Sequence, residues 1–221
     1  EEGDLPPGFQ FIKCHMIFDV KMGENFRRKA RMVAGGHMTE TPSSITYSSV
    51  VSRDSVRIAF LYAALNDLKV FACDIQNAYL TAMCREKVWC RAGPEFGDKE
   101  GRIMIIVRAL YGLKSSGAAF RSLLAEKIWE IGFRPSKADD DVWVRPAVKP
   151  DGTKYYELLL CYVDDVLGIS HDPNMLKCIA SHFKLKGDKI EEPETYLGAN
   201  MTKMVNAEGK VCLLYTSDAA D

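Results

Sequence analysis

Short runs in which hydrophobic and polar side chains alternate recur along the chain, and this period of two predicts β-strands. The first two runs, residues 11–20 and 26–34, are separated by turn-forming residues at 22–25 and predict a hairpin. Further strands are predicted at residues 68–74, 86–91, 103–108, 142–145, 155–163 and 166–170.

Three other segments carry apolar residues every three or four positions, which is the period of an α-helix. Ser52 is a predicted N-cap for a helix over residues 53–66, along which Val56, Ala59 and Phe60 share one face. A second helix is predicted over residues 115–131, and Gly132 ends it; a third is predicted over residues 174–184.

Composition and charge narrow the class of protein. The chain has 221 residues, of which 47% are hydrophobic and 27% charged, as in an ordinary folded protein. Its net charge is -1, so a site for a polyanion has to be local. A local excess of basic residues does occur between Lys21 and Arg31, where Glu24 is the one acidic residue.

Several features predict an intracellular protein that does not enter a membrane. No stretch reaches about 18 uninterrupted apolar residues, and the acidic first residues do not resemble a signal peptide. The seven cysteines include no CxxC pair, which favours reduced thiols over a disulfide framework or a zinc site.

Two adjacent aspartates, Asp164 and Asp165, separate two strongly apolar predicted strands at hairpin spacing. Burying an uncompensated carboxylate is unfavourable, so the pair implies either bound cations or exposure to solvent. Mg²⁺ prefers oxygen ligands, and Asp74, at the end of another predicted strand, is placed to complete such a site. The alternative is a solvated turn, because aspartate is common in turns.

Four blocks, in this order, resemble the reverse transcriptase of copia-type LTR retrotransposons. They are Lys29-Ala30-Arg31-Met32-Val33-Ala34-Gly35-Gly36-His37, Asp74-Ile75-Gln76-Asn77-Ala78-Tyr79-Leu80, Ala109-Leu110-Tyr111-Gly112-Leu113-Lys114 and Tyr162-Val163-Asp164-Asp165. Together with Gly132-Phe133 and Tyr196-Leu197-Gly198, the resemblance covers about residues 5–204.

The resemblance implies an α+β fold, namely the fingers and palm of a right-hand polymerase with an antiparallel palm sheet and the thumb missing. We expect fingers at residues 1–70, a palm at 71–204 with an inserted fingers part at about 86–120, and a tail at 205–221. Residues 211–221 resemble a translated sequencing adapter, and the chain starts without Met. Both features predict a fragment of a longer polyprotein.

By the same resemblance, Asp74, Asp164 and Asp165 are the catalytic, metal-binding triad. Two Mg²⁺ ions, with Mn²⁺ as a possible substitute, would activate the primer 3′-hydroxyl and stabilise the leaving pyrophosphate. Tyr162 and Val163 belong to the hairpin that carries the active site.

Lys29 and Arg31, two residues apart in a predicted strand, are expected to project from one face toward the triphosphate of an incoming nucleotide. The alternative is a solvated edge strand, on which basic residues discourage aggregation.

The resemblance also implies nucleotide-binding roles for four residues in two other blocks. Tyr79 would crowd the sugar 2′ position and so select deoxynucleotides, although a bare tyrosine is also an ordinary core residue. Tyr111, Gly112 and Lys114 match the loop that lies under the nucleotide and the template, although a glycine there is also an ordinary turn residue.

The predicted function is therefore RNA-directed DNA polymerase. The expected partners are dNTPs, a primer–template duplex of RNA/DNA or DNA/DNA, and the remainder of a retrotransposon polyprotein, in a cytoplasmic particle or the nucleus. One alternative is a catalytically silent nucleic-acid-binding remnant. Another is a magnesium-dependent phosphohydrolase, which would need a water-activating base that no His or Glu spacing indicates.

Overall fold

The computed structural model describes residues 5, 7–22, 25–40, 42–43, 46–205 and 211–217. Gly23 and Glu24 of the first predicted turn, and residues 206–210 and 218–221 of the predicted tail, lie outside these ranges. The chain divides into two compact units: residues 1–48 with 77–124, and residues 49–76 with 125–221.

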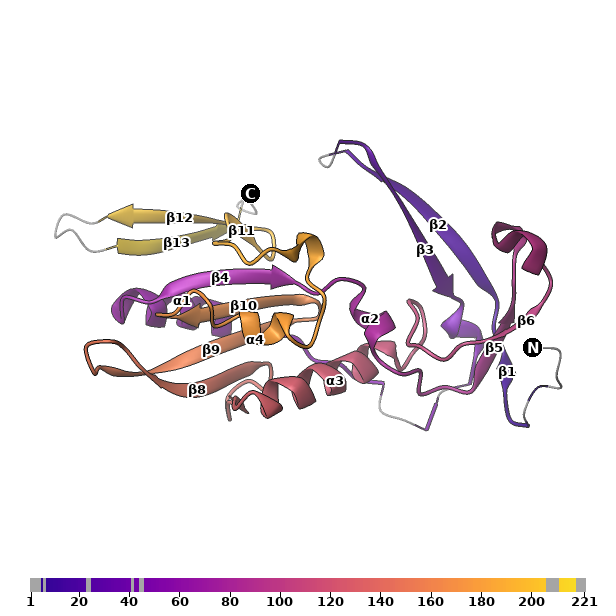
Figure 1. Ribbon diagram of the computed structural model, residues 1–221, viewed down its shortest axis with the longest axis horizontal. Helices are drawn as coiled ribbons and strands as arrows, with labels where there is room; N and C mark the ends of the chain where they lie inside the picture. Colours follow the sequence, from indigo (N-terminus) through magenta and orange to yellow (C-terminus); the bar gives the residue numbers. More distant parts are fainter. Residues whose placement is uncertain are drawn as a thin grey trace. The chain divides into compact units, whose positions relative to one another are not determined.

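The second unit is built on a five-stranded sheet in which every neighbouring pair is antiparallel (Figure 1). In spatial order its strands are β4 (Lys69–Asp74), β10 (Asp165–Ser170), β9 (Lys154–Tyr162), β8 (Val142–Val148) and β7 (Arg134–Pro135). Strand β10 therefore lies in the interior of the sheet, between the strand that ends in Asp74 and the strand that ends in Tyr162.

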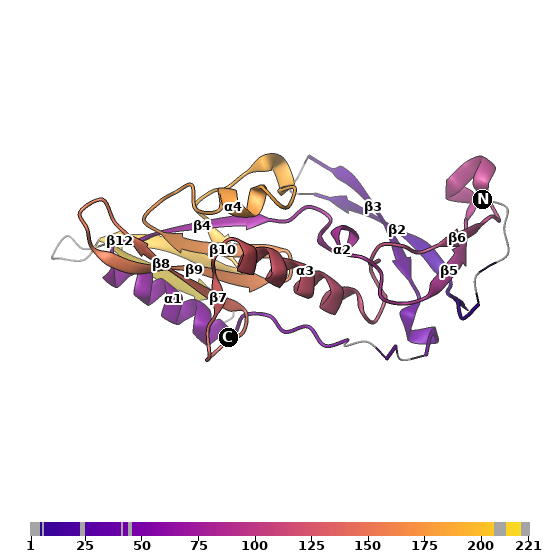
Figure 2. The same cartoon turned by 60° about the horizontal axis from the view of Figure 1, so that its bottom comes forward.

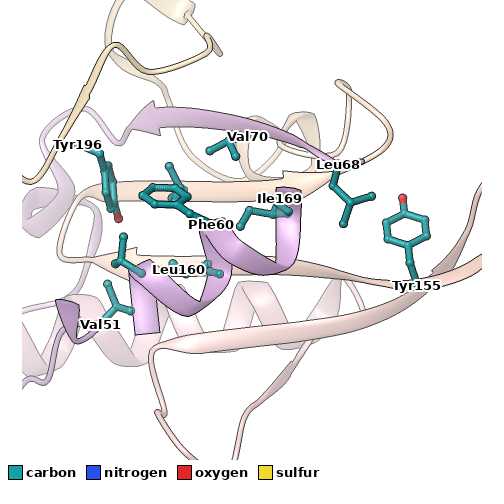
Figure 3. Packing of buried hydrophobic residues seen from close by; sticks show 12 residues of the cluster. Val51, Phe60, Leu68, Val70, Tyr155, Leu160, Ile169 and Tyr196 are labelled. Atoms are coloured by element: carbon teal, nitrogen blue, oxygen red, sulfur yellow. The ribbon is translucent and has the colours of Figure 1, made fainter. Parts of the chain in front are cut away.

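Helix α1 (Arg53–Leu65) covers one face of this sheet. It begins as predicted at Ser52, whose side chain accepts a hydrogen bond from the backbone N–H of Ser55. Phe60 lies in the centre of the core that α1 forms with the sheet (Figure 3). The members of this core are Val51, Val56, Ala59, Phe60, Ala63, Leu68, Val70, Tyr155, Leu160, Leu167, Ile169 and Tyr196.

The segment around α4 (Lys177–Ala180) covers the opposite face (Figure 2). A Cβ at Gly168 would lie 2.8 Å from the Leu176 side chain, so this face of β10 is in close contact with that segment. The prediction of a helix over residues 174–184 is wrong in its length. Leu185 pairs with Ile75 and the Lys184 carbonyl accepts the Gln76 N–H, which takes the chain out of helical conformation.

A small sheet of β11 (Thr195–Tyr196), β12 (Ala199–Val205) and β13 (Val211–Ser217) completes this unit. The Tyr215 ring lies 5.1 Å from the Phe60 ring, and its hydroxyl donates to the Tyr196 carbonyl at 3.2 Å. Of the segment predicted to derive from an adapter, residues 211–217 form β13, and the origin of the segment stays a prediction.

In the first unit, β2 (Cys14–Lys21) and β3 (Arg27–Ala34) form the predicted hairpin. A separate three-stranded sheet consists of β1 (Gln10–Phe11), β5 (Val88–Arg91) and β6 (Ile103–Ile105), and the last two strands are shorter than predicted. The core of this unit consists of Ile12, Ala34, Val88, Cys90, Leu110 and Leu113.

The remaining elements are short, apart from α3. They are the turns η1 (Gly36–Met38), η2 (Pro94–Lys99) and η3 (Lys186–Asp188), the helix α2 (Ala78–Thr81) and the helix α3 (Ser116–Glu130), which matches its predicted range closely. None of the helices in the described ranges is long and apolar enough to cross a membrane.

Candidate functional site

The Tyr-Val-Asp-Asp segment forms the turn between β9 and β10. Tyr162 pairs with Asp165, so the two turn residues are Val163 and Asp164. The prediction that Asp164 and Asp165 form the tip is therefore wrong by one residue, because Asp165 takes part in the ladders with both β9 and β4. Val163 has a φ of +54°, a left-handed conformation that is unfavourable for a β-branched residue.

The register brings the three predicted metal ligands to one end of the sheet. Asp74, the last residue of β4, lies directly opposite Asp165, the first residue of β10. The backbone N–H of Ile75 donates to the Asp164 carbonyl at 2.8 Å, which holds the turn against the end of β4. Residues directly opposite each other in an antiparallel pair share a face, so Asp74 and Asp165 lie on the same side of the sheet.

The electrostatics show that negative charge accumulates at this end. Partial burial, followed by repulsion from Asp164 and Asp74, raises the pKa of Asp165 to about 6, and the nearby Lys186 opposes that rise. The Lys186 ammonium donates to the Asp74 carboxylate with an Nζ–Oδ2 distance of 3.0 Å.

The chemistry of these carboxylates fits a divalent cation. Carboxylate oxygens are the donors that Mg²⁺ and Mn²⁺ prefer, and a doubly charged ion would relieve the repulsion that raises the pKa of Asp165. As the side chains are placed, no three His, Cys, Asp or Glu groups of the described residues converge closely enough to enclose an ion. The three carboxylates are thus suitable ligands for such an ion, and one of them, Asp74, forms an ion pair with Lys186.

The predicted triphosphate-binding residues lie in the first unit, on the β2–β3 hairpin. Lys29 and Arg31 share a face because they are two residues apart, as predicted. The register places Lys21 and Arg27 on this same face, opposite each other and beside the pair formed by Asp19 and Lys29. The sequence analysis noted the excess of basic residues but did not assign Lys21 and Arg27 to the site. The alternation of basic residues at 27, 29 and 31 could have identified Arg27, whereas Lys21 joins this face only through the hairpin register.

An aromatic and basic cluster in the same unit brings together three residues from distant blocks. The guanidinium carbon of Arg31 lies 5.8 Å from the centroid of the Tyr111 ring. The centroid of the Tyr79 ring lies 4.9 Å from the same Tyr111 centroid. A backbone bridge between Val33 and Tyr111 supports this contact, and the Phe120 ring of α3 lies 6.2 Å from the Tyr79 ring. Tyr79 is only half-buried, unlike an ordinary core tyrosine.

Gly112 lets two backbone segments touch beside this cluster. It has a φ of +90°, and a Cβ at this position would collide with the Ala34 carbonyl. The Ala34 N–H in turn donates to the Tyr111 carbonyl at 2.7 Å. Lys114 is placed differently: its ammonium donates to the Thr39 carbonyl at 2.6 Å, which anchors the loop around η1.

Comparison with known proteins supports one family. The family model described as reverse transcriptase (RNA-dependent DNA polymerase) matches residues 3–216. The Pol polyproteins of the Arabidopsis thaliana transposons RE1 and RE2 are 30% and 29% identical over 205 residues, or 87% of this chain. The Pol polyprotein of the Nicotiana tabacum transposon TNT 1-94 is 28% identical over 84% of this chain. The chain spans only 13%, 14% and 14% of these relatives, respectively.

Proposed function

Since the chain belongs to the reverse transcriptase family of copia-type transposon Pol polyproteins, we propose that it is an RNA-directed DNA polymerase that adds dNTPs to a primer 3′ end. The observation that carries the proposal is the register of β4 and β10, which sets Asp74 opposite Asp165 with Asp164 in the adjoining turn.

In this proposal Asp74, Asp164 and Asp165 hold two Mg²⁺ ions, which supply charge for activating a hydroxyl and for stabilising a pyrophosphate leaving group. The three carboxylates position those ions, and their mutual repulsion disfavours the empty state. The backbone bond between Ile75 and Asp164 keeps the turn in register with the end of β4, which preserves the spacing of the acidic groups.

The first unit would bind the nucleotide and act as the fingers, while the unit with the five-stranded sheet would act as the palm. The basic face of the β2–β3 hairpin suits a triphosphate, because Lys and Arg form charge-assisted hydrogen bonds with phosphate oxygens. Tyr79, held against Tyr111, presents a ring that could exclude a ribose 2′-hydroxyl.

The proposed partners are a primer–template duplex and the rest of a Pol polyprotein. A net charge of -1 leaves duplex binding to local basic surfaces, so we expect phosphate contacts and a marked dependence on salt.

Single-nucleotide addition tests the proposal. The 221-residue chain, in excess over a DNA primer on an RNA template, is mixed with Mg²⁺ and one dNTP, and the primer is resolved by length. We expect extension by the parent and a loss of roughly 100-fold or more in Asp164→Asn, which removes a charge from the proposed metal site. Equal extension by both would refute the site. Duplex binding without extension would favour a silent remnant, and release of phosphate without extension would favour a phosphohydrolase.

A further inference from the structure

Lys186 places a positive charge on one of the proposed metal ligands. Its ammonium nitrogen lies 3.0 Å from Asp74 Oδ2, and both side chains are partly exposed, at 45% and 34%. This ion pair joins η3, in the segment that follows α4, to the last residue of β4.

The backbone around Lys186 is fixed rather than loosely attached. Leu185 is 3% exposed and bridges to Ile75, the residue that follows Asp74. One residue earlier, the Lys184 carbonyl accepts the Gln76 N–H at 2.9 Å. These two contacts hold the backbone next to Lys186 against the residues that follow β4. The proximity of Lys186 to Asp74 therefore follows from this backbone pairing.

An ammonium and a divalent cation cannot share this carboxylate favourably. Both carry positive charge, and their repulsion at a separation of a few ångströms is strong where water is partly excluded. A metal ion that binds Asp74 therefore has to displace the Lys186 ammonium or remain close to it. Either way, the lysine lowers the affinity of the protein for the metal.

We propose that Lys186 is an internal counter-cation, a positioning residue that balances the Asp74 carboxylate of the metal-free protein and has to release it when a metal binds. This inference rests on the proposed function, because it takes Asp74 to be a metal ligand. It implies that the lysine stabilises the metal-free site at the expense of metal affinity, so that binding of a divalent ion and release of the lysine are coupled.

The test is a direct titration of the 221-residue chain with Mn²⁺, followed by the electron paramagnetic resonance signal of the free ion, without nucleotide or nucleic acid. In Lys186→Gln we expect Mn²⁺ to bind about tenfold more tightly, which corresponds to about 1.4 kcal/mol. In metal-free buffer with a chelator, the same variant should melt at a slightly lower temperature than the parent, because the Asp74 carboxylate loses its partly exposed partner.

Two matched variants control for net charge and for chain length at this position. Lys184→Gln makes the same change in net charge two residues away and should alter Mn²⁺ affinity less than twofold. Lys186→Arg keeps the positive charge and should bind Mn²⁺ about as weakly as the parent.

Asp74→Asn separates failure of this inference from failure of the proposed function. If Asp74→Asn weakens Mn²⁺ binding but Lys186→Gln leaves it unchanged or weakens it, the counter-cation role is refuted and the metal site stands. If Asp74→Asn binds Mn²⁺ like the parent, the metal site itself is refuted, and the role of Lys186 falls with it.

Discussion

Alanine in place of Gly112 is expected to raise the free energy of the folded unit that carries the aromatic and basic cluster by about 2–5 kcal/mol. Two separate terms add up to this value. The backbone at Gly112 has a φ of +90°, and a non-glycine residue in the left-handed region costs about 1–2 kcal/mol. The new Cβ would also collide with the Ala34 carbonyl, and forcing an extra carbon into a packed site costs about 1–3 kcal/mol.

Two other glycines of the same unit isolate these terms. Gly101 has a φ of +75° but open space around the Cβ position, so Gly101→Ala should show the conformational term alone. A Cβ at Gly36 would collide with the Gly112 carbonyl, while its own φ lies outside the left-handed region, so Gly36→Ala should show the steric term alone. Each replacement also gains about 0.4–1 kcal/mol through the unfolded chain. This gain cancels between the three variants, and it reduces the net loss of Gly112→Ala relative to the parent to about 1–5 kcal/mol.

Urea unfolding and thermal melting provide the measurement. For a chain of this size a loss of 1 kcal/mol lowers the Tm by about 2–4 °C, so the net loss in Gly112→Ala should lower the Tm by about 2–20 °C relative to the parent. Hydrogen exchange gives a local reading, because the Ala34 N–H donates to the Tyr111 carbonyl at 2.7 Å and should lose protection. If Gly112→Ala and Gly101→Ala are equally stable, the close approach of the two backbone segments is refuted.

Three further substitutions test other parts of the structure. Tyr79→Ala should raise incorporation of ribonucleotides relative to deoxynucleotides, whereas Tyr79→Phe should not, as a comparison of single-nucleotide addition rates would show. Burial raises the pKa of Asp139, but hydrogen bonds from residues at the start of α1 outweigh it and hold that pKa below its usual value. Asp139→Asn should therefore lower the free energy of unfolding by about 1 kcal/mol at neutral pH. The difference in stability between variant and parent should shrink as the pH falls below about 4, and a difference that does not change with pH would refute the role of these hydrogen bonds. Glu157→Gln removes the charge of a buried carboxylate that pairs with the partly exposed Arg145 (2.6 Å) and should cost about 1.5–3 kcal/mol in chemical unfolding, whereas Glu126→Gln in an exposed pair of α3 should leave stability nearly unchanged.

Local signals in the sequence were sufficient for most elements of the fold. The alternation in residues 11–34 predicted the β2–β3 hairpin, and Ser52 with the apolar stripe after it predicted α1 and its first turn. These features depend on neighbouring residues only, which is why periodicity and capping rules recover them. The helix predicted over 174–184 failed because its last residues pair with a segment about 110 positions away.

The candidate site was predictable only in part, for a similar reason. The sequence placed Asp74 and the Asp164-Asp165 pair at strand ends; the preference of Mg²⁺ for oxygen ligands suggested that they form one site, and the family resemblance implied it. No local pattern connects Lys186 with Asp74, which is 112 residues away, so the counter-charge emerged only from the structure. The boundaries of the two apolar runs made the two aspartates the predicted tip, but Asp165 pairs with both neighbouring strands and so belongs to β10.

The end of β10 is unfavourable in two independent ways, and the interior of the sheet compensates for both. Val163 has a left-handed backbone conformation, which costs about 1–3 kcal/mol for a residue other than glycine. Asp165 is partly buried close to the carboxylates of Asp164 and Asp74. The strand that follows is among the most deeply buried in the described chain, with Val166, Leu167 and Ile169 fully inaccessible to solvent. The packing of a buried interior strand fixes the conformation of the turn at its end. The carboxylates therefore stay close even though they repel one another. Strain and repulsion at this turn, where local sequence rules also fail, are the features expected of a site selected for chemistry rather than for stability.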